Sequence, residues 1–257
     1  MKCVSRFETK IFSKLVRLCQ SRLGIGVDSN SGKNGEANVL RSLSEYFGSK
    51  DTLQLFDVGA NRGGYTSLLL SAFPHATVHA FEPAGQTFKL LSELHGTEQR
   101  VVLNNVGLGS ESGKMSIFYD REGSGLTSLY QRDLNHIGVE LNQSETIVLT
   151  TIDEYCENKR IQKLDFMKVD VEGHELEVFK GARRMLEQSR IHAIQFEFGG
   201  CNIDSGTYFK DFWKLLHEQY HFYRITQRGI VHLYRYTESH EQFGYQNIFL
   251  KLRSLQE

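Results

Sequence analysis

One segment constrains this chain more than any other, the run F-D-V-G-A-N-R-G-G-Y over residues 56–65. An apolar run at residues 53–58 leads into it, and a helical pattern begins near Tyr65. The segment therefore predicts a strand, a glycine-containing loop whose backbone N–H groups approach a ligand, and a helix. A second apolar run, residues 76–81, ends at Glu82, where an acid can accept both hydroxyls of a ribose. Together the two strand ends predict a nucleoside-binding site.

The composition of this loop favours a methyl donor over a dinucleotide. A dinucleotide site needs G-x-G-x-x-G, so that a pyrophosphate can rest on the helix N-terminus, and the glycine spacing here differs. The loop also follows a carboxylate, Asp57, which suits the ammonium and sulfonium of S-adenosyl-L-methionine better than two phosphates. Three alternatives stay open: Asp57 as a cap of the following helix, a nicotinamide-dependent oxidoreductase, and a nucleoside-binding protein without catalysis.

Strand and helix patterns alternate along the chain, which is typical of a parallel sheet covered on both faces. The spacing predicts strands at residues 53–58, 76–81, 101–106, 164–169, 191–196, 222–225, 231–234 and 247–250. It predicts helices at residues 65–73, 84–95 and 174–186. It also predicts a further helix that Asp204 or Ser205 can cap, with one apolar face formed by Phe209, Phe212, Trp213 and Leu216. The last three strands follow one another without helices, which indicates an antiparallel edge. The predicted fold is therefore α/β, a doubly wound, Rossmann-like and mostly parallel sheet of about seven strands.

Two further strand patterns, residues 115–119 and 145–149, flank a polar loop at residues 120–144. A loop of that length inside a compact domain is usually functional or mobile. Its sequence carries no motif that assigns it a role.

The N-terminal part of the chain differs from the rest, so we divide the chain into residues 1–35, a basic amphipathic helix and linker, and residues 36–257, one domain. Residues 2–23 combine helical apolar spacing with six basic side chains and a single acid, Glu8. Such a helix can lie on an anionic membrane face or contact a partner subunit. The pattern favours packing on its own domain or on a partner subunit.

Composition narrows the class of protein further. The formal net charge is −1, the pI is near 6.8 and the mean hydropathy is −0.38, so no global basic field recruits nucleic acid and no apolar run predicts a membrane span. The four cysteines lack zinc-ligand spacing, and no secretory leader pattern follows Met1. We therefore expect a cytoplasmic protein with free thiols, with peripheral contact at the inner membrane face left open.

A second dense motif, L-D-F-M-K-V-D-V-E-G-H-E, occupies residues 164–175. Asp170 follows the predicted strand directly, which places it on the same sheet edge as Asp57 and Glu82, where open α/β sheets bind ligands. His174 falls in the first turn of the next helix, where the helix dipole favours the neutral imidazole that can accept a proton. His174 is therefore a candidate general base, although it could instead only satisfy the N–H groups of that turn.

Glu197 ends the neighbouring strand, in the run Q-F-E-F-G. Asp170 and Glu197 are therefore expected to face each other across two strand ends. Two carboxylates so placed could bind a hard divalent cation or orient substrate hydroxyls, and Glu172 and His174 could complete such a shell. The sequence alone does not decide whether a metal ion binds there.

The chain resembles the FkbM-type family of S-adenosylmethionine-dependent methyltransferases over about residues 53–250. The resemblance rests on F-D-V-G-A-N-R-G-G-Y-T, V-H-A-F-E-P, N-N-V-G-L-G, the run around D-V-E-G-H-E, and the closing N-I-F-L. It implies a class I methyltransferase fold and an O-methyltransferase. Family members often act on a sugar hydroxyl of a glycolipid, polysaccharide, lipopolysaccharide or glycoside.

The resemblance also implies roles for single residues. Asp57, Gly59 and Asn61 would line the methionine end of the cofactor, Glu82 the ribose, and Asn105 to Gly107 the adenine side. Ala60 and Tyr65 belong to the same predicted cofactor site. For catalysis we expect His174 to be the base, with Asp170 and Glu197 orienting the base or the acceptor. The expected partner is a small-molecule or glycan acceptor, with no nucleic acid.

Overall fold

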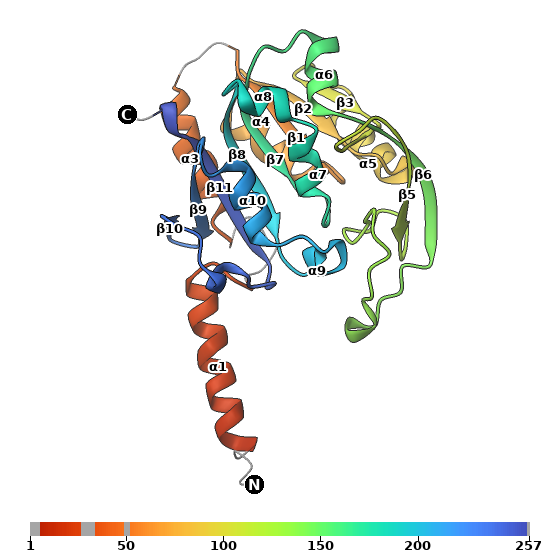
Figure 1. Cartoon of the computed structure of the whole chain (residues 1–257). Coiled ribbons are helices and arrows are strands. Elements are labelled where there is room, and N and C mark those ends of the chain that lie inside the picture. The colour runs from red at the N-terminus through yellow and green to blue at the C-terminus, as the bar shows by residue number, and fades with distance from the viewer. Residues whose placement is uncertain (1–5, 27–33, 49–51, 256–257) are drawn as a thin grey trace.

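The computed structural model describes residues 6–26, 34–48 and 52–255, and a large twisted sheet forms its centre (Figure 1). In spatial order its strands are β10 (Gly229–Leu233), β9 (Tyr220–Thr226), β11 (Gln246–Leu252), β8 (Ile191–Phe198), β7 (Leu164–Val169), β1 (Gln54–Val58), β2 (Thr77–Phe81) and β3 (Val101–Asn104). The five strands from β8 to β3 are parallel, whereas β11, β9 and β10 pair antiparallel. The mostly parallel sheet with an antiparallel edge is confirmed, with eight strands rather than about seven.

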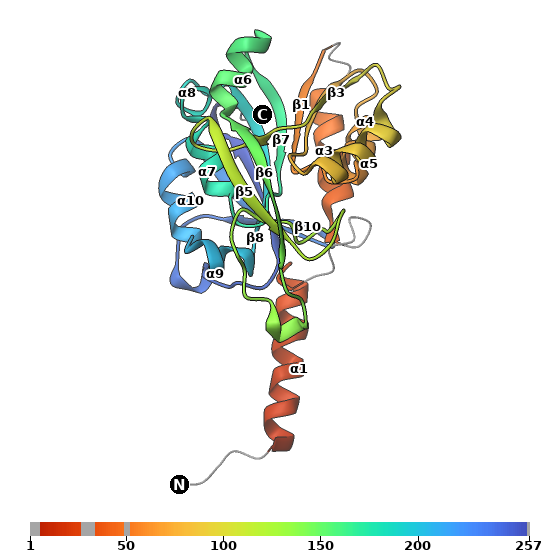
Figure 2. The same ribbon diagram turned by 90° about the vertical axis from the view of Figure 1, so that its right-hand side faces the viewer.

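Helices cover both faces of this sheet, which confirms the doubly wound arrangement (Figure 2). One face carries α3 (Glu36–Phe47), α4 (Gly64–Ala72) and α5 (Gly85–His95), and the other carries α6 (Ile152–Lys159), α7 (Glu175–Lys180), α8 (Arg183–Glu187) and α10 (Phe209–Leu216). Alternate side chains of each strand enter two separate cores, as the two-residue period requires. Phe166 of β7 packs beneath α3 and α4, whereas its neighbour Met167 packs beneath α7 and α10.

A second, smaller sheet lies beside the first. Its strands run in the order β4 (Gly107–Leu108), β6 (Gln143–Thr150) and β5 (Gly113–Tyr119). The strands predicted at 115–119 and 145–149 are therefore confirmed, and they pair antiparallel with each other. Between them the long loop contains only η1 (Asn135–Ile137) and a bridge that joins Phe118 to Ser128.

Two predicted helices have different limits. The helix expected at 174–186 is divided into α7 and α8 at Gly181. This glycine packs so tightly that a Cβ there would lie 1.9 Å from the carbonyl oxygen of Gly109. The helix expected to follow Asp204 or Ser205 is present as α10 (Phe209–Leu216), but the predicted cap is wrong. Both residues belong to the short α9 (Cys201–Ser205), and α10 begins after Tyr208, whose N–H donates to the Asp211 carboxylate at 3.0 Å. Short 3-10 turns, η2 (Glu238–His240) and η3 (Arg253–Leu255), flank the last strand.

The predicted N-terminal helix is present as α1 (Arg6–Arg22), but it projects from the body instead of packing on it (Figure 1). Its apolar side chains are exposed, and Phe7 keeps 73% of its surface. The exposure of these side chains contradicts packing of the helix on its own domain, whereas the other half of the prediction, packing on a partner subunit, stays a prediction. Residues 27–33 of the predicted linker lie outside the described residues. Among the helices described, none combines the length and apolar character needed to cross a membrane.

Candidate functional site

A cavity of about 860 Å³ opens at the carboxyl ends of β1, β2, β7 and β8. The loop after β1, Glu82 after β2, the acids that end β7 and β8, and residues 124–129 of the long loop all line it. Of the predicted cofactor residues, six contribute to its wall: Gly59, Ala60, Asn61, Tyr65, Glu82 and Gly107. The sheet edge that the sequence singled out is therefore the edge that carries the cavity.

The loop after β1 has a conformation that depends on Gly59. Its φ is +83°, in the left-handed region, and a Cβ at this position would lie 1.9 Å from the carbonyl oxygen of Asp170. The N–H groups of Gly59 and Ala60 both donate to the carbonyl of Phe81, at 3.0 and 2.9 Å. This contact draws the ends of β1, β2 and β7 together, so that their acids share one cavity.

Glu82 is a buried carboxylate at the cavity wall, with 7% of its surface exposed. Backbone N–H groups hold both oxygens, Asn61 donating to Oε2 at 3.0 Å and Ala84 to Oε1 at 2.9 Å. Burial raises its pKa to about 7, and the two N–H bonds oppose that rise. Each carboxylate oxygen has a further lone pair, so Glu82 can accept two ribose hydroxyls.

Asp57 and Asn105 lie behind this wall rather than on it. The Asp57 carboxylate is 1% exposed, accepts the Thr66 hydroxyl at 2.6 Å and has its pKa raised to about 6 by burial. The amide of Asn105 donates to the carbonyls of Glu82 and Pro83, at 2.9 and 3.0 Å. Neither residue is part of the cavity lining. Their geometry is that of residues that shape the loops. Asp57 does not cap the following helix, because α4 has Gly63 at its N-cap position and no side-chain cap hydrogen bond. A direct contact of either residue with the cofactor stays a prediction.

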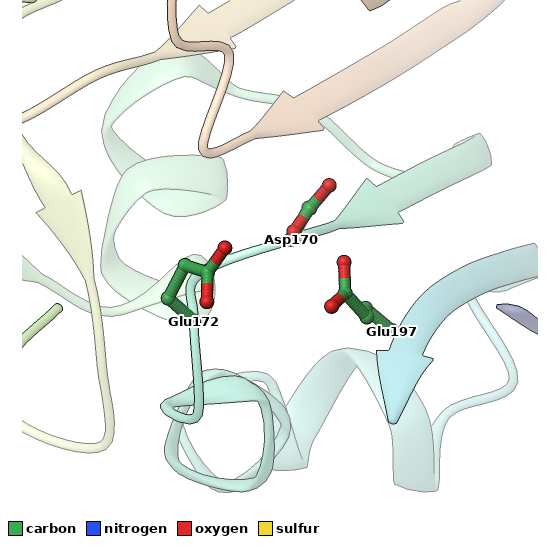
Figure 3. A group of neighbouring side chains, drawn as sticks. All are labelled: Asp170, Glu172 and Glu197. Atoms are coloured by element: carbon green, nitrogen blue, oxygen red, sulfur yellow. The ribbon is translucent and has the colours of Figure 1, made fainter. Parts of the chain in front are cut away.

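Three acids converge on the other side of the cavity (Figure 3). Asp170, Glu172 and Glu197 form what we call the carboxylate cluster, in which one oxygen of each lies within 4.8 Å of the others. Burial and the charge of Asp170 raise the pKa of Glu197 well above its ordinary value. Burial would also raise the pKa of Asp170, but the Lys168 ammonium, 3.1 Å away, and a hydrogen bond from Glu197 lower it. The two shifts have opposite directions, so they favour an ionised Asp170 beside a protonated Glu197.

Two cations balance the cluster, and sequence analysis assigned neither of them a role. Lys168 is 2% exposed in the middle of the sheet, and its Nζ lies 3.7 Å from Oε1 of Glu36, the first residue of α3. Arg132, from the long loop, pairs with Glu172 at 2.5 Å and with Asp204 at 3.2 Å. A lysine within a buried strand could have been noticed in the sequence as a signal for Lys168. Nothing in the loop sequence marked Arg132.

His174 is buried and lies outside the cavity lining. Its Nδ1 is 3.1 Å from the Tyr130 hydroxyl, and its Nε2 faces Gly109, where a Cβ would lie 3.1 Å away. Burial lowers its pKa, so the ring is neutral, as a base requires. The cluster Asp170, Glu172 and Glu197 is thus brought together as expected, but His174 does not join it. Its role as a base remains a prediction, without a direct path to the cavity.

Comparisons with known proteins identify the family. The methyltransferase FkbM domain matches residues 57–225. The chain is 34% identical over 185 residues to hexuronic acid methyltransferase AglP of Haloferax volcanii, covering 72% of this chain and 69% of AglP. This chain belongs to the FkbM methyltransferase family. It is also 23% identical over 147 residues to 2-O-methyltransferase NoeI of Sinorhizobium fredii, covering 53% of this chain and 60% of NoeI.

Solved structures resemble this fold more distantly. The precorrin-6y C5,15-methyltransferase of Geobacter metallireducens aligns with 89% of this chain and 97% of its own, at 11% identity and a TM-score of 0.45. A likeness of that degree shows nothing about function. Family membership makes the protein a methyltransferase and implies S-adenosylmethionine as its donor, and it removes the oxidoreductase alternative.

Proposed function

We propose that this protein transfers a methyl group from S-adenosylmethionine to a hydroxyl of a sugar or glycoconjugate. One observation carries the proposal: Glu82, placed to accept ribose hydroxyls, and the carboxylate cluster line the same cavity. The cofactor would occupy the side of Gly59, Asn61 and Glu82, which leaves the cluster facing the acceptor. The names of two relatives, a hexuronic acid methyltransferase and a 2-O-methyltransferase, support a sugar hydroxyl as acceptor.

The cluster has the chemistry that such an acceptor needs. A sugar hydroxyl is a weak nucleophile, so its proton must be taken or shared as the methyl group moves. Asp170 is the candidate acceptor of that proton, since Lys168 and Glu197 keep it ionised. Attack in line with the departing sulfur requires the oxygen about 3 Å from the methyl carbon. The sulfonium leaves as a neutral thioether, so no oxyanion needs stabilisation.

The cluster also fits a hard divalent cation. Three carboxylates with oxygens within 4.8 Å offer the ligand type that Mg²⁺ and Ca²⁺ prefer. A cation held by Asp170, Glu172 and Glu197 would displace the proton of Glu197 and would require Glu172 to loosen its pairing with Arg132. When bound, it would lower the pKa of an acceptor hydroxyl. A bound cation is the alternative to Asp170 acting alone, and chelation tests it.

Transfer of labelled methyl groups from S-adenosylmethionine into a cell extract tests the function. We expect label in the lipid or polysaccharide pool, or in a small glycoside. Asp170→Asn and Glu197→Gln should each lower the rate by at least about 10²-fold, as is typical for loss of a proton-transfer group. Glu187→Gln, an equal change on the exposed end of α8, should leave it unchanged. Label found only in protein or nucleic acid would refute the proposal.

Adding a chelator to the same assay separates two roles of the cluster. If a cation is required, chelation abolishes transfer and Mg²⁺ restores it. If Asp170 acts alone as the base, chelation has no effect. Because the pKa of Asp170 is lowered from its ordinary value of 3.8, Asp170 is already ionised near neutral pH, and its own ionisation gives the rate no pH dependence there. Full activity in both cluster variants would place the acceptor elsewhere.

A further inference from the structure

The helix α1 exposes an apolar surface that its own domain leaves uncovered. The surface, which we call the apolar stripe, is formed by Phe7, Ile11, Phe12, Leu15, Val16 and Leu18, each between 42% and 73% exposed. Helical spacing gathers these side chains on one side of the helix. Isolated exposed apolar residues are normal, but a continuous stripe along a projecting helix marks a contact surface.

A basic face flanks the apolar stripe along one edge of α1. Lys10, Lys14 and Arg17 follow one another at intervals of four and three residues, which places them on one face, and all three are exposed. Residues 7–22 contain four basic side chains and one acid, Glu8. Two copies of this helix packed together would bring like charges close, whereas an anionic surface complements them. This charge pattern decides against a second copy as the partner.

The junction between α1 and the body is firmly built and adjoins the cavity. Gly24 has φ +77°, and a Cβ there would lie 2.1 Å from the carbonyl oxygen of Ile225. Ile25 is buried, and Gly26 N–H donates at 2.7 Å to the carbonyl of Tyr245, a residue of the cavity wall. Both views place α1 at the end of the body that carries α9, which directly follows the strand of Glu197 (Figures 1 and 2). The projecting helix and the cavity therefore share one end of the molecule.

We propose that α1 binds an anionic lipid bilayer, with the apolar stripe in the interface and the basic face toward the headgroups. A helix of 17 residues with a strong apolar side and a basic side has the properties of an interfacial helix. It is too short and too charged to cross the bilayer, in agreement with the absence of a spanning helix among the described residues. The proposal does not depend on which acceptor is methylated, because it concerns only the binding of α1 to a bilayer.

Sedimentation of the full chain with two kinds of vesicle tests the proposal. We expect strong binding to vesicles of equal parts phosphatidylcholine and phosphatidylglycerol, weaker binding at high salt, and little binding to phosphatidylcholine alone. Each basic side chain near an anionic surface contributes roughly a fivefold change in partition. Replacing Lys10, Lys14 and Arg17 with Gln should therefore weaken binding on the order of a hundredfold. The matched control replaces three exposed lysines of the body with Gln: Lys89, Lys114 and Lys214.

A second variant tests the apolar stripe. Phe12→Ser with Leu15→Ser should weaken binding at every salt concentration, and circular dichroism would show whether α1 remains helical. Equal sedimentation with both kinds of vesicle would overturn the proposal, and so would unchanged binding of the Lys10, Lys14 and Arg17 variant. A dimer in sedimentation velocity that the Phe12 and Leu15 variant dissociates, without vesicle binding by the wild type, would assign the stripe to a second copy instead.

Discussion

Glu82 offers the sharpest test of the cofactor site, because its charge should act in opposite directions on stability and on binding. Its pKa in the folded protein is about 7, against an ordinary value of 4.5, with burial as the main cause. The folded state therefore keeps a proton that the unfolded state releases as the pH rises from 4.5 to about 7. Stability from this group is present at low pH and is lost across that window.

The expected size follows from the same interval. Each pH unit between the two pKa values is worth about 1.4 kcal/mol, so Glu82 should lower the free energy of unfolding by up to about 3 kcal/mol between acidic and neutral pH. Glu82→Gln removes this dependence. The amide, like the protonated carboxyl, has a single carbonyl oxygen to accept from the two backbone N–H groups, so the two proteins should have similar stability at acidic pH. As the pH rises, the wild type loses stability that the variant keeps, so the difference between the two proteins should be largest at neutral pH.

Urea denaturation of both proteins between about pH 5 and about pH 8 measures this difference. Other buried acids, such as Asp57, affect both proteins alike and cancel in the comparison. Calorimetry with S-adenosylmethionine measures the other effect of the Glu82 charge, the effect on cofactor affinity. Ribose hydroxyls need the ionised carboxylate, so wild-type affinity should rise with pH up to about 7, while Glu82→Gln binds at least about tenfold more weakly. A stability difference independent of pH, together with equal affinities, would refute the assignment of Glu82 as a buried cofactor ligand.

Three further variants test the loop after β1, the position of Asp57 behind the cavity wall, and His174 as the general base. Gly59→Ala should lower the free energy of unfolding by about 2–4 kcal/mol through left-handed strain and the clash at 1.9 Å, whereas Gly64→Ala, with open space around it, should be neutral in the same urea titration. Asp57→Asn should leave cofactor affinity by calorimetry within about threefold, since Asp57 lies behind the wall; a larger loss would place its charge at the cofactor. His174→Ala should keep the methyl-transfer rate within about tenfold; a loss of about 10²–10⁴-fold with unchanged cofactor affinity would restore it as the base.

The sequence predicted those parts of the fold that short segments determine. The strand expected at 164–169 agrees with β7 at both ends, because a short, mostly apolar segment that is soon followed by a glycine is typical of a buried strand. Glu82 and Gly59 were also predicted in their places, since each lies one or two residues after a strand of a parallel sheet. The position of a residue directly after a strand can be predicted from the local sequence, without knowledge of distant contacts.

Long-range contacts explain what could not be predicted. Arg132 reaches Glu172 across 40 residues of sequence, and Glu36 reaches Lys168 across more than a hundred, so neither pairing leaves a local pattern. His174 was expected at the cavity because it begins a helix after the right strand. The loop at Tyr130 and the backbone at Gly109 cover its ring instead, and only the tertiary structure shows that.

The charges of the cavity connect the cofactor with the reaction. Among the described residues that line it, five are acids and three are bases: Glu36, Glu82, Asp170, Glu172 and Glu197, against Arg62, Arg132 and Lys168. Burying an excess of carboxylates is costly, and the raised pKa values of Glu82, Glu172 and Glu197 show that cost. A cationic cofactor, and a divalent cation where one binds, relieves it. Methyl transfer turns the sulfonium into a neutral thioether, so the product loses the charge that the cavity favours, which assists its release.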